Sequence, residues 1–113
     1  MSGGWIGVDL DGTLASSADW RGLHHVGPPV PAMLKRVKGW LADGVEVRIF
    51  TARASVPEDE RDEVVRVIQD WCEAQGLPRL AVTNVKDFAM IELWDDRAVR
   101  VVRNMGVAVG FVK

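Results

Sequence analysis

The stretch IGVDLDGTLA, residues 6–15, begins as an apolar β-strand and ends in two carboxylates followed by a glycine. A short apolar run bounded by turn residues is typical of a strand, and we expect one from Trp5 to Asp9. Side chains two residues apart on a strand point to the same side, so Asp9 and Asp11 should leave the strand together. Because a buried, unpaired carboxylate costs on the order of several kcal/mol, the rest of the chain must supply a compensating group.

The composition is that of an ordinary globular domain, with 113 residues, 48% hydrophobic content and a net charge of −2. This length predicts a single domain over residues 1–113 that buries about two thirds of its unfolded surface. The sequence has no apolar run near the ~20 residues of a membrane span, and residues 1–4 are too short and polar to start a signal peptide. With a lone cysteine, Cys72, we expect a cytoplasmic protein without a membrane partner. The weakly acidic balance gives no argument for nucleic-acid binding but leaves room for a local basic groove.

Hydrophobic spacing predicts two helices and about five strands. One helix is expected between Pro31 and Gly44, and a second opens with acidic residues near Ser55 and ends at Gly76. Strands are expected over residues 5–9, 45–50, 80–83, 90–94 and 107–112, while 97–105 fits either a helix or a strand. The alternating order implies right-handed crossovers and a mainly parallel sheet, so the predicted fold is a single α/β, Rossmann-like domain.

The strand patterns also predict that one face of the sheet is thinly covered. Both helices should lie on one face, and parallel strands buried on both faces usually read as continuous apolar runs. Here the second strand alternates apolar residues with Glu46 and Arg48, and the fourth carries Glu92 between apolar neighbours. Phe50 and Trp94 are then candidates for the contact surface of a homo-oligomer. Polar residues at strand ends beneath loops would explain the pattern equally well.

Each of the first four predicted strands is followed by polar groups. In chain order these are Asp9 with Asp11, Thr51, Lys86, and Asp95 with Asp96. Open α/β sheets bind ligands at the carboxyl ends of their strands, so we expect these side chains to meet at one edge. Gly12 permits a sharp turn whose backbone N–H groups suit an anion such as phosphate.

Taken singly, each of these groups has a simpler interpretation. The pair Asp11–Gly12 is favoured in turns, and a Thr or Lys at a strand end is commonly a cap or a solvated side chain. Asp95 and Asp96 with Arg97 would also make a surface ion-pair cluster. The ordered set at successive strand ends is much harder to produce by accident.

The ordered set resembles the four motifs of the haloacid dehalogenase-like superfamily of phosphohydrolases, over nearly the whole chain. The matching segments are DLDGT at 9–13, FTAR at 50–53, Lys86 within TNVKD, and WDDR at 94–97. The first motif is distinctive, and the others gain weight from their order and spacing. Many members insert a cap domain between these motifs, but here predicted helices and strands fill the intervening segments. We therefore expect no cap domain, with residues 16–27 as a candidate flap.

The resemblance implies a Mg²⁺-dependent phosphomonoester hydrolase that forms an aspartyl-phosphate intermediate. Asp9 is then the nucleophile and Asp11 the general acid and base, while Thr51 and Lys86 hold the phosphoryl oxygens. The implied metal ligands are Asp9, the Asp11 carbonyl and Asp96, with Asp95 binding directly or through water. The physical chemistry agrees, because a hard divalent cation is the natural way to neutralise several nearby carboxylates.

The implied substrate is a phosphorylated metabolite, a nucleotide or a nucleic-acid end. The expected substrate-binding residues are Leu10, Gly12, Thr13, Trp20, His24 and Arg53. His24 and its neighbour His25 are more simply ordinary loop residues than metal ligands. Arg53 resembles an arginine of some polynucleotide-end phosphatases, although a salt bridge to Glu58–Glu60 is the preferred interpretation.

Two other kinds of protein would place similar residues at strand ends. A receiver-type phosphoacceptor module carries its acidic pair on the first strand and the acceptor aspartate on the third, whereas DLDGT comes first here and Lys86 precedes Asp95 and Asp96. A catalytically silent binding protein on the same fold would tolerate degraded motifs, and none of the motif positions looks degraded. The residue order therefore favours the phosphatase.

Overall fold

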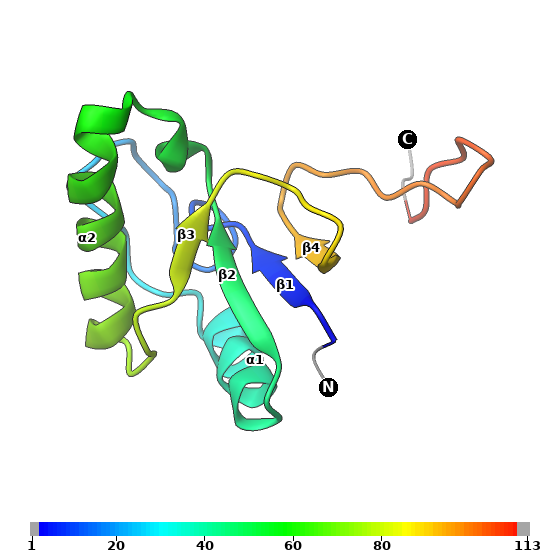
Figure 1. Cartoon of the computed structure of the whole chain (residues 1–113), viewed down its shortest axis with the longest axis horizontal. Helices are drawn as coiled ribbons and strands as arrows, with labels where there is room; N and C mark the ends of the chain where they lie inside the picture. Colours follow the sequence, from blue (N-terminus) through cyan, green and yellow to red (C-terminus); the bar gives the residue numbers. More distant parts are fainter. Residues whose placement is uncertain (1–2, 111–113) are drawn as a thin grey trace.

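The fold is built on one parallel sheet with the strand order β3-β2-β1-β4 in the computed structural model, which describes residues 3–110 (Figure 1). The strands are β1 (Trp5–Val8), β2 (Glu46–Phe50), β3 (Ala81–Thr83) and β4 (Met90–Trp94). All three strand pairs are parallel. The predicted single α/β, Rossmann-like architecture is confirmed, and the described residues contain no cap domain.

Two helices cover one face of this sheet. Helix α1 (Pro31–Ala42) begins with proline at its first position, and α2 (Glu58–Ala74) follows the short 3₁₀ helix η1 (Ala52–Ser55). Each long helix is followed by a glycine with positive φ, at Gly44 and Gly76, where a residue with a side chain would be strained. No helix of residues 3–110 is long and apolar enough to cross a membrane.

The core lies between the helices and the sheet. On β2, Val47 and Ile49 are buried, while Arg48 points to the other face, as the alternating pattern predicts. On α1 the buried residue is Val37, and on α2 the buried residues Val64, Ile68 and Cys72 form one stripe. These residues belong to a single hydrophobic cluster, so both helices pack on the same face of the sheet.

Among residues 3–110 no helix covers the opposite face, and polar side chains of the chain itself cover its centre. Trp5 is fully buried there, with the Arg48 guanidinium stacked 4.4 Å from its ring centroid. The Trp5 indole N–H donates to Asp87 at 2.9 Å, and Arg48 forms an ion pair with the same carboxylate at 3.5 Å. An arginine and an aspartate thus enclose the largest aromatic side chain of this face.

The assignment of Trp94 to the uncovered face is wrong. Its ring packs edge-on against Trp40 of α1, with ring centroids 5.2 Å apart, and the Arg36 guanidinium lies 4.8 Å from it. The pairing of β1 with β4 shifts register between Trp5 and Ile6, and this irregularity decides which β4 side chains face the helices. A period-two pattern alone does not reveal such a shift.

The predicted fifth strand is also wrong over residues 107–110, and its remaining part, 111–112, lies outside the described residues. Residues 97–105 form neither a helix nor a strand. Positive φ angles at Asn104 and Gly106 turn the chain back on itself, and the Val102 N–H donates to the Val107 carbonyl at 2.8 Å. The result is an isolated bridge rather than a strand of the sheet, which has four strands among residues 3–110.

The packing of β2 against the helices predicts a large effect of truncating Ile49, which is fully buried. We expect Ile49→Ala to lower the free energy of unfolding by about 2–5 kcal/mol, because it removes buried methyl groups and leaves a cavity. The exposed Val85 is the control, and Val85→Ala should change the same quantity by less than about 0.5 kcal/mol. Equal effects of the two substitutions in urea titrations would contradict this description of the core.

Candidate functional site

Three carboxylates meet at the carboxyl ends of β1 and β4. Asp9, Asp95 and Asp96 each offer an oxygen, and these oxygens all lie within 4.8 Å of one another. The two segments are joined where the Asp9 N–H donates to the Trp94 carbonyl at 2.8 Å, one hydrogen bond beyond the strand pairing. The parallel pairing of neighbouring strands therefore brings together acidic residues more than 80 positions apart.

The turn after β1 fits closely around this cluster. The Thr13 hydroxyl lies 3.4 Å from both the Asp9 and the Asp96 carboxylates, and it accepts the Asp96 N–H at 3.1 Å. Gly12 has φ +89°, and a Cβ there would lie 2.6 Å from an Asp96 carboxylate oxygen, so this position requires glycine. The Leu10 side chain is fully buried in the core, which leaves only its backbone to face a ligand.

Burial and the neighbouring carboxylates raise the pKa of Asp9 to about 7, from an ordinary value of 3.8. Burial is the largest cause, followed by the charge of Asp95, a hydrogen bond with Asp96 and the charges of Asp96 and Asp11. At neutral pH the folded protein therefore holds a proton on Asp9 in a good part of the molecules. A bound cation would reverse this effect and favour the carboxylate.

Asp11 has a different partner from the other acidic residues. Arg53 donates to both of its carboxylate oxygens, at 2.8 and 2.7 Å, in a bidentate ion pair. Arg53 is only 6% exposed, donates a further hydrogen bond to the Leu23 carbonyl and lies 4.8 Å from the ring centroid of Trp20. The expected salt bridge to Glu58–Glu60 is therefore wrong, because the guanidinium turns inward to Asp11.

Thr51 lies at the end of β2 and is 3% exposed. Its N–H donates to the Thr83 carbonyl at 2.9 Å, and its hydroxyl accepts the Arg53 N–H at 3.1 Å as the N-cap of η1. The capping bond fixes the start of η1 and with it the backbone from which the Arg53 side chain departs.

A cavity of about 880 Å³ opens beside these groups. The predicted site residues in its lining are Asp9, Asp11, Trp20, Thr51, Arg53 and Asp95. Phe50, Asn84 and Arg97 also line it, and the sequence analysis did not assign them to the site. Asn84 directly follows β3, so the strand-end argument that selected Thr51 could have found it.

Six predicted site residues are absent from the lining of this cavity. Leu10, Gly12, Thr13 and Asp96 belong to the carboxylate cluster and its turn, whereas Lys86 and His24 lie elsewhere. Lys86 is exposed in the loop between β3 and β4, forms no ion pair with residues 3–110 and is absent from the cavity lining. His24 is exposed as well, and its Nε2 lies 3.9 Å from a Glu63 carboxylate oxygen on α2. Their predicted contacts with a substrate stay predictions.

The loop over residues 16–27, predicted as a flap, is anchored at both ends. The Ser16 N–H donates to the Pro28 carbonyl at 2.7 Å, and the Trp71 indole N–H donates to the Gly27 carbonyl at 2.9 Å. Between these anchors, Leu23 and Trp20 contact Arg53. The loop thus forms one wall of the site.

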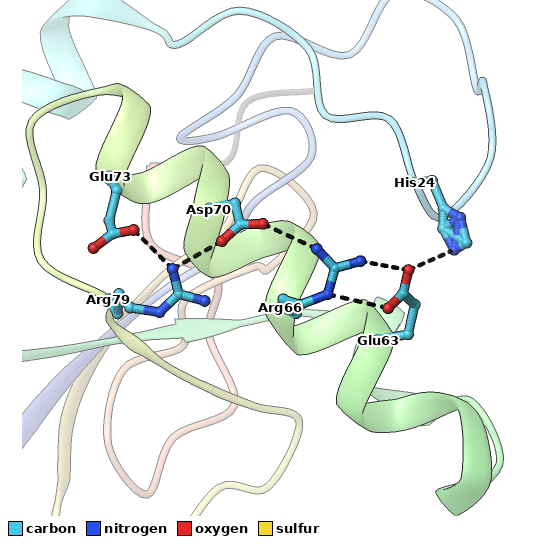
Figure 2. Close-up of polar contacts among 6 residues, drawn as sticks. All are labelled: His24, Glu63, Arg66, Asp70, Glu73 and Arg79. Atoms are coloured by element: carbon cyan, nitrogen blue, oxygen red, sulfur yellow. Dashed lines mark hydrogen bonds and ion pairs between the residues drawn. The ribbon is translucent and has the colours of Figure 1, made fainter.

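His24 joins the same loop to a chain of charges along α2 (Figure 2). From the loop outward, the chain consists of His24, Glu63, Arg66, Asp70, Arg79 and Glu73. Hydrogen bonds from Arg66 and Arg79 lower the pKa of Glu63 and Asp70, respectively. Because these side chains are solvent-exposed, each pair contributes little to stability by itself.

The comparisons with known proteins support the fold alone. The chain matches no protein-family model and no curated protein. It is similar to the solved structure of a conserved protein from Bacteroides thetaiotaomicron, with a TM-score of 0.59 and 19% sequence identity. The match covers 87% of this chain and 79% of the other.

The raised pKa of Asp9 predicts a loss of stability with increasing pH. Since the folded state binds the proton more tightly, the contribution is fully present below about pH 3.8 and is lost as the pH rises through about 7. In a chelating buffer, we expect Asp9→Asn to raise the Tm at pH 8 by about 4 °C or more, and to change it little at pH 4. Thermal unfolding followed by circular dichroism measures both values, and an equal difference at the two pH values would contradict the raised pKa of Asp9.

Proposed function

We propose that the chain is a Mg²⁺-dependent phosphomonoester hydrolase that acts through an aspartyl-phosphate intermediate. The observation that carries the proposal is the convergence of Asp9, Asp95 and Asp96 beside a cavity that Asp9 and Asp95 line, with the pKa of Asp9 raised by burial and by the other two. A site that leaves its central carboxylate half-protonated at neutral pH is suited to a cation. The three carboxylates also favour a phosphate substrate that binds as its complex with a metal ion, because the cation offsets their negative charge.

The donor set fits Mg²⁺. All three side chains offer oxygen ligands, which this hard cation prefers, and the close approach of Asp96 depends on Gly12. Asp9, Asp95 and Asp96 would hold the ion, which would supply charge neutralisation for the phosphoryl group when bound. A soft metal would favour cysteine or histidine ligands, and the only cysteine, Cys72, is buried in the core on α2.

Asp9 is the proposed nucleophile, because its carboxylate lies in the cluster and lines the cavity. An Asp9 oxygen attacks phosphorus, the bond from phosphorus to the ester oxygen breaks, and the leaving oxygen takes a proton from Asp11, which has turned from Arg53 and taken that proton from solvent. Water then attacks the aspartyl phosphate and passes a proton to Asp11, which releases inorganic phosphate and restores Asp9. Thr51 lines the same cavity and is the proposed hydroxyl contact of the phosphoryl group.

Arg53 controls the orientation of Asp11 in this scheme. Both Asp11 oxygens now accept hydrogen bonds from the guanidinium, so proton transfer requires one of them to turn toward the leaving oxygen. A substrate phosphate offers Arg53 another bidentate anionic partner. We therefore propose that the bound phosphoryl group competes with Asp11 for Arg53 and frees the acid for its role.

The leaving group is proposed to lie against Trp20 and Phe50. Trp20 is 64% exposed although it is large and apolar, and both aromatic residues line the cavity beside the carboxylates. Asn84 and Arg97 add polar contacts on the same walls. The cavity is wide enough for a phosphorylated metabolite, a nucleotide or the end of a nucleic acid, and its aromatic wall favours a leaving group with a planar ring.

The proposed nucleophile predicts the outcome of a hydrolysis assay. With an aryl phosphate and Mg²⁺, we expect release of inorganic phosphate, and Asp9→Asn should lower kcat/KM by at least about 10³-fold. Asp62→Asn, on the exposed surface of α2, is the matched control and should retain the wild-type rate. Wild-type activity in Asp9→Asn would refute the assignment. Stoichiometric phosphorylation without turnover would instead support the receiver-type module, and absence of both would support a silent binding protein.

The two residues after β4 should differ in their effect on the metal. We expect Asp96→Asn to raise the Mg²⁺ concentration needed for half-maximal thermal stabilisation more than Asp95→Asn does. The reason is that the Asp96 carboxylate lies close to Gly12 and 3.4 Å from the Thr13 hydroxyl, whereas an Asp95 oxygen already accepts the Arg97 N–H at 2.8 Å. The Tm is measured over a Mg²⁺ titration at pH 8, and the opposite order would exchange the roles of the two residues.

A further inference from the structure

The C-terminal arm, residues 97–110, extends away from the sheet beside β4 (Figure 1). Every residue of the arm is exposed, and six of them are large and apolar. These six are Val99, Val101, Val102, Met105, Val107 and Val109. Exposed apolar residues are ordinary when scattered singly, but a contiguous segment of them indicates a surface that another surface covers.

The backbone of the arm is already paired with itself as an incipient hairpin. Val101 and Ala108 form an antiparallel bridge, and the Val109 N–H donates to the Arg100 carbonyl at 2.7 Å. An isolated two-stranded hairpin is at best marginally stable in water. The arm therefore needs a third strand or an apolar surface beside it.

The outer edge of β4 offers both of these. Within residues 3–110, β4 pairs only with β1, so its second edge presents free backbone N–H and carbonyl groups. Ile91 on this strand is 54% exposed, and Phe88 in the preceding loop is fully exposed. An unprotected edge strand flanked by apolar side chains is a template for the addition of another strand.

The charges of the two surfaces are complementary. The arm carries Arg97, Arg100 and Arg103 and contains no acidic residue. Glu92, at the centre of β4, forms no ion pair with any residue of the described range, and neither do Arg100 and Arg103. The arm is thus cationic and apolar, whereas the outer strand β4 carries an acidic residue between apolar ones.

We propose that the arm of one molecule adds along the outer edge of β4 of a second copy of the chain, and that the exchange is reciprocal. Both complementary surfaces occur on the same chain, which is the requirement for a two-fold dimer whose contacts are repeated. The arm departs from the end of β4 and extends away from its own sheet, so the edge it covers belongs to the other copy. This dimer uses the edge of the sheet rather than the face that Arg48 and Asp87 already cover.

The oligomeric state of the full chain tests this proposal. We expect sedimentation velocity to show a dimer that dissociates on dilution, and the double variant Val101→Asp/Val107→Asp to be a monomer at every concentration. The control Ala32→Asp/Ala42→Asp adds the same charge at exposed positions of α1 and should remain a dimer. Circular dichroism verifies that each variant is folded.

Two further experiments identify the surfaces involved: charge reversal at Arg100 and Glu92, and hydrogen exchange of the backbone amides. Arg100→Glu and Glu92→Arg should each weaken the dimer by about tenfold or more, and the two substitutions in one chain should restore it. Hydrogen exchange should slow over residues 90–94 and 99–109 as the concentration of the wild-type chain rises. A wild-type chain that stays monomeric, or a dimer that survives Val101→Asp/Val107→Asp, would overturn the proposal.

Discussion

Mutual repulsion of carboxylates at the ends of β1 and β4 is the constraint on which the site depends. The parallel pairing of these strands fixes the neighbours of Asp9, because the same hydrogen bonds that hold the sheet together place Asp95 and Asp96 beside it. Burial then makes the repulsion costly, as the raised pKa of Asp9 shows. The turn through Gly12 and the hydroxyl of Thr13 bring the carboxylates closer instead of separating them. A sheet that holds like charges together in this way fits a protein that binds a cation.

The bidentate ion pair with Arg53 distinguishes Asp11 from the other acidic residues of the site, Asp9, Asp95 and Asp96, which form the carboxylate cluster. Arg53 is buried and donates to both Asp11 oxygens, so the pair fixes the orientation of the Asp11 carboxylate. The same guanidinium contacts the Leu23 carbonyl and the Trp20 ring. The position of the loop over residues 16–27 is thereby coupled to the position of Asp11. A ligand that engages Arg53 would act on the acid and on the loop wall at the same time.

The sequence predicts well where the strands of this protein end, but it predicts poorly which side chains form ion pairs across the site. Where each strand ends follows from local patterning, and a parallel sheet then brings those ends to one edge, which is why Asp9, Thr51 and Asp95 all line the cavity. The partner of Arg53 lies 42 residues away, and no local rule selects Asp11 over the nearer acidic residues of α2. The face taken by Trp94 depends on a register shift, and the missing fifth strand depends on backbone angles at Asn104 and Gly106.

Asp95 and Asp96 connect the carboxylate cluster to the C-terminal arm, because they are the only residues between β4 and the arm. Strand pairing fixes their N-terminal side, and the Arg97 N–H donated to Asp95 gives a contact on the other side. In an isolated molecule the exposed arm gives little support to this short link. An arm held on a second copy would fix the link from both ends and reduce the entropy that the carboxylates lose when they bind a cation. The affinity of the proposed metal site and that of the proposed dimer would thus be coupled through these two residues, and ligand binding would favour assembly as much as assembly would favour binding.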